Sequence, residues 1–218
     1  MSASSGVDVV LDVTHYLKVF IALFILVNPF EGIPYFLSAT ETMPQKERDR
    51  VARRAGVGVA TILLVSLVLG RLILAVFGIT TPAFQTAGGV IVFLIGLRMV
   101  LSSPETGAER AIIVAHRDIA IVPLATPLLA GPGAISSVIV YASHSPGAMN
   151  YALLAFIVML VGAATLLSLR LAGPVARRMG PIGVDISSRI MGLLVTAIAL
   201  EMIISGVTKL VPALGRVS

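Results

Sequence analysis

Long apolar stretches separated by short polar segments dominate this chain. Six such stretches occur, and each has about 20 residues, enough for an α-helix to cross the hydrocarbon core of a bilayer. The pattern therefore predicts an all-α membrane protein with six transmembrane helices. We place these helices at about residues 16–39, 57–77, 82–98, 119–142, 151–171 and 190–211.

Local signals mark helix ends and contacts. Pro44 precedes polar residues and predicts a helix start, since proline is favoured in a first helical turn. Thr81 is a plausible N-cap, with Pro82 as the first residue of the third helix. Small residues inside the stretches predict close helix contacts, at Gly88, Gly89, Gly96, Gly162, Ala163, Ala164 and Gly192.

The first stretch is interrupted in its middle by the motif NPFEGIP, residues 28–34. Its two prolines each lack an N–H group and clash with the carbonyl four residues back, so both cannot sit in an unbroken helix. The fourth stretch carries a similar motif, TPLLAGPG, residues 126–133, whose prolines follow those of the first motif at an offset of 98 residues. We predict that helices 1 and 4 are both broken.

The paired motifs divide the chain into two halves of three helices each. Repeat 1 covers about residues 14–101 and repeat 2 about residues 118–211. A basic segment, residues 102–117, connects them within one transmembrane domain of 218 residues, and residues 111–114 suggest an interfacial helix there. Because three crossings are an odd number, the second half enters the membrane from the opposite side, which predicts two inverted three-helix repeats.

Basic residues lie almost entirely on one side of this topology. The segments joining helices 1 to 2, 3 to 4 and 5 to 6 hold twelve Lys and Arg residues, whereas the two turns on the other side hold none. Cytoplasmic loops are enriched in these residues. We expect a bacterial inner-membrane protein with both termini on the periplasmic or outer side.

Composition narrows the functional classes. Charged residues make up 12% of the chain, against roughly 25% in soluble domains, so the net charge of +5 reflects orientation in the membrane and not a nucleic-acid partner. The absence of cysteine excludes thiolate metal sites, and the three histidines show no metal-ligand spacing. We expect no enzymatic activity, metal or cofactor. Membrane lipid is an expected partner, and association into a homo-oligomer is left open.

A broken helix inside a membrane points to a binding site. Its freed backbone groups would each cost several kcal/mol in lipid, so a break must face protein or a water-filled cavity. Half-helix N-termini attract carboxylates and C-termini attract cations, so two facing breaks could hold both ends of a zwitterion. A packing kink is the alternative explanation of either motif. The candidate substrate-binding residues are Asn28, Pro29, Gly32, Pro34, Thr126, Pro127, Gly131, Pro132, Gly133 and Ser136.

The polar candidates each have two interpretations. Asn28 and Thr126 directly precede the first proline of each motif, and each either binds the ligand or caps freed backbone groups. Ser136 and Ser137 either line a cavity or bond to carbonyls of their own helix.

Two acids lie within the predicted helices, Glu31 in the first break and Glu201 roughly midway along helix 6. A charged acid at the bilayer centre costs about 2.5–3.5 kcal/mol, so each is protonated, paired or exposed to a water cavity. Both are proton-coupling candidates. The alternative role is a neutral, hydrogen-bonded carboxyl that fixes helix packing.

These motifs resemble a known family over essentially the whole chain. NPFEGIPYFL is similar to the NPxGxxPxFL signature of the MarC family, and AGGVIVFLIGLRM, PLATPLLAGPGAI and RIMGLLVTAIALEMIISG resemble later segments of that family. One position departs from it, because Glu31 stands where the family motif usually has glycine, and Gly32 follows. The resemblance implicates Asn28, Pro29, Gly32, Pro34, Pro127, Gly131, Pro132 and Gly133.

The MarC family is named for an association with multiple antibiotic resistance and is also described as a small neutral amino-acid transporter family. Some members are proposed to move glycine and alanine with protons, and the family is grouped with LysE-type exporters. The resemblance implies a secondary transporter of a small neutral amino acid or similar zwitterion, with or without proton coupling. The alternatives are an exporter of another small metabolite or drug, and a non-transporting membrane scaffold. A polar cavity lined by both motifs would favour transport, whereas lipid-exposed breaks would favour the scaffold.

Overall fold

The computed structural model describes residues 13–101, 129–144 and 147–211. These residues form seven α-helices, and no strand occurs among them. The all-helical fold agrees with the prediction. The helices are α1 (Val13–Val27), α2 (Pro29–Ala39), α3 (Gln45–Val76), α4 (Thr81–Leu101), α6 (Pro132–His144), α7 (Ala148–Arg170) and α8 (Ala172–Leu210).

Five membrane-spanning candidates occur in the described parts of the chain, each long and apolar enough to cross a bilayer. They are residues 14–39, which join α1 and α2, together with α3, α4, α7 and residues 182–210 of α8. The first part of the predicted fourth span lies outside the described residues, as does the basic segment 102–117. The second part of that span is α6, which has 13 residues.

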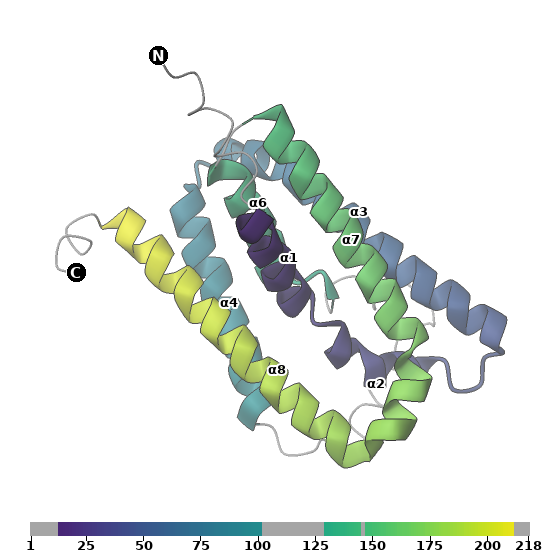
Figure 1. The fold of residues 1–218 in the computed structure, drawn as a ribbon. Coiled ribbons are helices and arrows are strands. Elements are labelled where there is room, and N and C mark those ends of the chain that lie inside the picture. The colour runs from purple at the N-terminus through teal and green to yellow at the C-terminus, as the bar shows by residue number, and fades with distance from the viewer. Residues whose placement is uncertain (1–12, 102–128, 145–146, 212–218) are drawn as a thin grey trace.

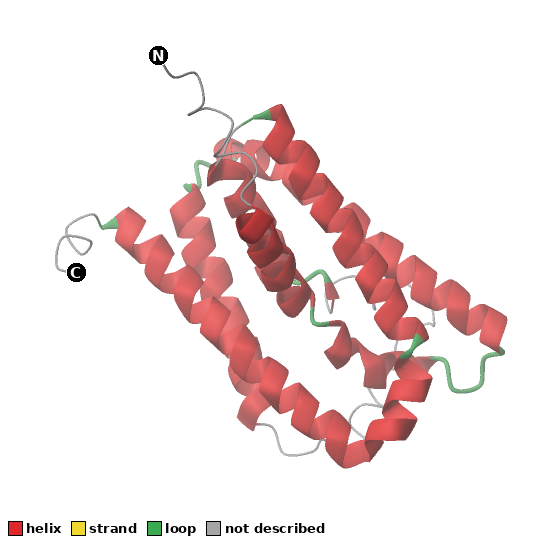
Figure 2. Ribbon diagram, viewed as in Figure 1, coloured by secondary structure: helices red, strands yellow, loops and turns green. Residues whose placement is uncertain are grey.

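The helices form two long antiparallel pairs with the broken first span between them (Figure 1). α3 packs along α7, and α4 packs along α8. α6 contacts both α3 and α4, so it also joins the two pairs. Figure 2 shows loops near the two ends of the bundle, as expected for helices that cross a bilayer, and two further short loop segments in its middle.

Glycines allow both helix pairs to approach closely. A Cβ atom on Gly56 of α3 would lie 2.7 Å from the carbonyl oxygen of Gly162 in α7. In the other pair, a Cβ atom on Gly96 of α4 would lie 3.0 Å from the carbonyl oxygen of Gly192 in α8. Larger residues could not occupy these crossings without moving the helices apart, which confirms the predicted close contacts at Gly96, Gly162 and Gly192.

The core surrounds α1, while the outer faces of the bundle are apolar. Leu23 of α1 is completely buried. In contrast, Val68 of α3 and Phe156 of α7 are 66% and 67% exposed. Exposed apolar side chains on this scale suit contact with lipid, so the surface supports the membrane assignment.

Two helix boundaries differ from the predictions. Thr80 caps α4 in place of Thr81, because the Ala83 N–H donates to Thr80 Oγ1 at 3.3 Å, the three-residue reach of an N-cap. The last span begins earlier than residue 190, because helix continues from residue 182. One kink interrupts α8, at Gly180, whose φ of 66° and ψ of 176° form a combination that glycine adopts without strain.

Candidate functional site

The first break lies at Asn28, between α1 and α2. The Asn28 N–H donates to the Phe24 carbonyl at 3.0 Å and completes α1, while the Asn28 carbonyl accepts from the Glu31 N–H at 3.1 Å and begins α2. Asn28 itself has φ 44° and ψ 63°, the left-handed conformation. Pro29 has no N–H to continue the hydrogen-bond ladder of α1, so the chain turns here. The predicted break in the first span is confirmed.

The second proline of this motif does not interrupt the chain again. Pro34 lies inside α2, which continues to Ala39. The bond that Pro34 cannot make would have gone to the carbonyl of Phe30, in the first turn of α2. The motif therefore produces one sharp break at Asn28, followed by a short helix that tolerates its second proline.

The second motif provides the start of α6. Gly131 is not helical, α6 begins at Pro132, and the Ile135 N–H donates to the Gly131 carbonyl at 3.2 Å. Thr126 and Pro127 lie outside the described residues. The two motifs touch each other, because a Cβ atom on Gly32 would lie 3.0 Å from Leu129 Cδ2. Segments almost 100 residues apart in sequence therefore meet inside the bundle.

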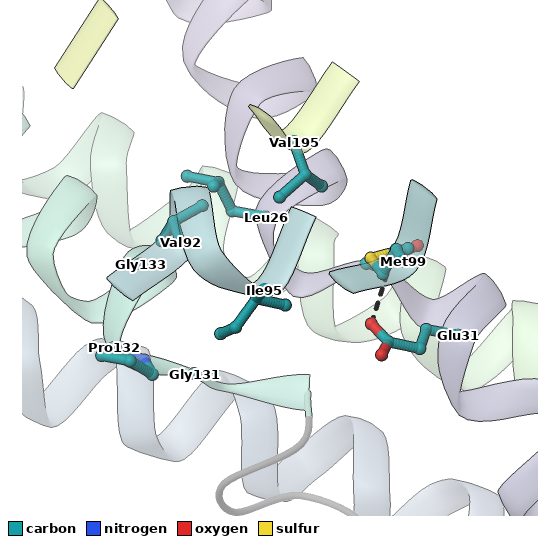
Figure 3. Close-up of a pocket in the computed structure, with 10 residues that line it drawn as sticks. Leu26, Glu31, Val92, Ile95, Met99, Gly131, Pro132, Gly133 and Val195 are labelled. Carbon is teal, nitrogen blue, oxygen red and sulfur yellow. Dashed lines mark hydrogen bonds between the residues drawn. The ribbon is translucent and has the colours of Figure 1, made fainter. Parts of the chain in front are cut away.

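A small pocket lies where the two motifs meet. Its volume is about 40 Å³, space for roughly three water molecules. In the view of Figure 3, residues of α4 lie between Glu31 of the first motif and the Gly131–Gly133 segment of the second. The lining residues are Leu26, Asn28, Glu31, Val92, Ile95, Met99, Gly131, Pro132, Gly133 and Val195.

The Asn28 side chain is the most deeply buried polar group of the pocket. Only 5% of the residue is exposed. Its Nδ2 donates to Glu31 Oε2 at 3.3 Å and to Met99 Sδ at 3.6 Å. Its Oδ1 is buried and has no hydrogen-bond partner. A buried acceptor left in this condition costs about 1–3 kcal/mol, so the arrangement calls for a functional explanation.

The capping interpretation of Asn28 is wrong for its side chain, which makes no cap hydrogen bond to α2. The left-handed backbone turns the side chain toward Glu31 and Met99 and away from the first N–H groups of the helix. The corresponding interpretation of Thr126 lies outside the described residues.

The other described candidates do not line the pocket. Pro29 and Gly32 are buried in α2. Ser136 is buried and donates to the Pro132 carbonyl at 2.7 Å, and Ser137 donates to Met202 Sδ at 3.6 Å. Ser136 thus makes the bond within its own helix that was one of its two expected roles, while Ser137 joins α6 to α8.

The two acidic candidates occupy different environments. Glu31 lines the pocket and accepts from Asn28. Glu201 is exposed on α8, close enough to Tyr141 for an electrostatic interaction, and it is not part of the pocket. In the described parts of the chain, no three His, Asp or Glu residues are grouped so that they could hold a metal ion.

Sequence reasoning missed the far wall of the pocket. Val92, Ile95 and Met99 come from α4, and Val195 comes from α8. These are apolar residues in apolar helices, so no local signal distinguishes them from lipid-facing neighbours. The spacing of the three α4 residues, at intervals of three and four, is that of any single helix face.

Comparisons with known proteins place the chain among integral membrane proteins. The sequence model of a family described as "MarC family integral membrane protein" matches residues 13–211. The chain is 38% identical to the UPF0056 membrane protein MJ1677 of Methanocaldococcus jannaschii, over 90% of this chain and 98% of that protein. It is 37% identical to the UPF0056 membrane protein YhcE of Escherichia coli, over 93% of this chain and 96% of that protein. No solved structure matches the chain.

Proposed function

The chain belongs to the MarC family of integral membrane proteins, and from this premise we propose that it is a secondary transporter of a small neutral amino acid or a similar zwitterion. The observation that carries the proposal is one pocket lined by both broken segments. Asn28 and Glu31 come from the first, and Gly131, Pro132 and Gly133 come from the second. Paired breaks of this kind form the binding sites of many secondary transporters.

The chemistry of the pocket suits a solute with two opposite charges. Glu31 and the C-terminal end of α1 make the first break attractive to a cationic group. At the second break, the Gly133 and Ala134 N–H groups have no acceptor within α6, and the helix dipole favours a carboxylate there. A small amino acid carries both groups on neighbouring atoms.

We further propose that the two halves are inverted repeats, as the motif spacing predicts. Exchanging the halves maps α3 onto α7 and α4 onto α8, and the two long antiparallel pairs join these equivalent helices. In alternating access, one group of helices would rock against the other around the shared pocket. The concentration of basic residues supports an inner-membrane orientation with both termini on the periplasmic or outer side.

Glu31 is the better-placed proton-coupling residue. It lines the pocket beside Asn28, so a change in its protonation state would directly alter the binding of a solute in the pocket. Glu201 lies away from the pocket and has no comparable route to the solute. We therefore assign coupling to Glu31 in the proposed mechanism.

Counterflow in proteoliposomes tests the transport function. Purified protein is reconstituted with unlabelled alanine or glycine inside, and uptake of labelled amino acid is followed with and without a pH gradient. We expect accelerated exchange of one or both amino acids relative to protein-free vesicles, and a response to the gradient.

An absence of exchange for a panel of small zwitterions would contradict the amino-acid proposal. Exchange confined to other small metabolites would support the exporter alternative. The scaffold alternative predicts breaks that face lipid, whereas Asn28 is 5% exposed and lines a pocket, which argues for transport.

A further inference from the structure

The orientation of the Asn28 carboxamide is fixed by its neighbours. The two groups beside Nδ2, a carboxylate oxygen of Glu31 and the sulfur of Met99, are hydrogen-bond acceptors. A flipped amide would place Oδ1 against both of them and lose both bonds. The amide nitrogen is therefore hydrogen-bonded, whereas Oδ1 is buried without a partner. We call this atom the open oxygen.

The backbone holds this oxygen in place. Asn28 is the junction of two helices, with its N–H bonded to Phe24 and its carbonyl bonded to Glu31. Its left-handed conformation is the only one with positive φ at a non-glycine residue in the described chain. Because the residue is fixed at both ends and lines the pocket, the open oxygen cannot easily find another partner within the protein.

The end of α1 beside Asn28 also favours a positively charged group, because a helix C-terminus carries partial negative charge. Pro29, which has no N–H, begins α2 directly after Asn28, and Glu31 lines the same pocket. A hydrogen-bond donor with positive charge complements both the acceptor Oδ1 and this helix end. An anionic or purely accepting group would be repelled.

We propose that Asn28 Oδ1 accepts a hydrogen bond from an N–H of the ligand's ammonium group, and that this contact makes the site select ligands with an N–H-bearing ammonium over quaternary ammonium analogues. The inference rests on the proposed function for the identity of the pocket as a solute site. It adds the orientation of the bound solute, with its ammonium at the first break. It also names Asn28 Oδ1 as the atom that binds the ammonium.

Equilibrium binding separates this inference from transport itself. Labelled glycine is bound to the purified full chain in detergent, and N-methylglycine, N,N-dimethylglycine and N,N,N-trimethylglycine compete with it. All four carry the same carboxylate, and only the last lacks an N–H donor. We expect the trimethyl compound to compete at least roughly tenfold more weakly than N,N-dimethylglycine, as a hydrogen bond to a charged group would require.

Asn28→Gly tests the assigned atom. Glycine adopts the left-handed backbone without strain, so the break is preserved while the acceptor is removed. This variant should lose the discrimination between the dimethyl and trimethyl compounds, a ratio that a general loss of stability would not change. Tyr16→Phe is the matched control, because it removes another side-chain hydrogen bond, 3.0 Å from Tyr16 to Asn150, outside the pocket. It should keep the discrimination.

The outcomes separate cleanly. Equal competition by trimethylglycine, or discrimination that survives in Asn28→Gly, would overturn the inference even if counterflow proves transport. Discrimination that depends on Asn28, found in a protein that catalyses no counterflow, would support the inference and remove the transport proposal. A complete failure to bind any of the four compounds would count against both.

Discussion

The two proline motifs share a spacing, but the breaks described in them present different chemistry. The first exposes side chains to the pocket, the carboxamide of Asn28 and the carboxylate of Glu31. The second, from Gly131 to Gly133, has no polar side chain and offers only the backbone at the start of α6. One break is therefore a set of acceptors, and the other is a set of backbone donors.

This difference teaches that repeated motifs need not give repeated sites. The prolines at the two described breaks are not equivalent, because Pro132 corresponds to Pro34, which lies inside α2, while Pro127, the counterpart of Pro29, lies outside the described residues. The residues around them also differ, and they decide the charge that each break prefers. A pocket whose two sides prefer opposite charges suits a solute whose two ends carry opposite charges.

The largest effect on counterflow and stability is expected from adding a methyl group at the second break. A Cβ atom on Gly133 would collide with the buried side chain of Val92, and overpacking of this kind costs about 1–3 kcal/mol. We expect Gly133→Ala to abolish counterflow and lower the unfolding temperature in detergent. Val92→Ala in the same chain should restore both in part.

Gly32→Ala is the matched change at the first break. The new Cβ atom would lie 3.0 Å from Leu129 Cδ2, the end of a flexible side chain that can shift. Its effect on counterflow and on unfolding should be smaller than that of Gly133→Ala. An equal or larger effect would contradict the packing difference described for the two breaks.

Substitution of the two acids should have effects of intermediate size. Glu31→Gln should remove the response of uptake to a pH gradient while counterflow remains measurable, because the amide is nearly isosteric and cannot carry the proton. Glu201→Gln should leave the gradient response in place. Loss of the response in Glu201→Gln alone would move the coupling role to α8 and away from the first break.

The smallest expected effect concerns the backbone of the first break. Alanine in the left-handed conformation costs about 1–2 kcal/mol, whereas glycine avoids that strain. Asn28→Ala should therefore unfold at a lower temperature than Asn28→Gly, although both lack the carboxamide. Identical unfolding temperatures would show that the backbone at Asn28 relaxes and that its conformation is not imposed by the surrounding helices.

Some features of the structure could be predicted from the local sequence, and others could not. Asn28-Pro29 predicted a break in the first span, and the helix does end at Val27. The start of α3 after Pro44 and the close crossing at Gly96 and Gly192 were predicted as well. Each of these follows from the covalent structure of one residue type, a missing N–H or a missing Cβ, and needs no knowledge of distant contacts.

Other features depended on packing between distant segments. The contribution of Met99 to the pocket and the different positions of Glu31 and Glu201 follow from how α4 and α8 lie against the first break. The open oxygen of Asn28 exists because two acceptors from different parts of the chain face its amide nitrogen. The sequence by itself determined the break at Asn28 and the start of α3, since these follow from local backbone chemistry. Only the tertiary structure decided which side chains meet there, because that depends on contacts between residues far apart in the chain.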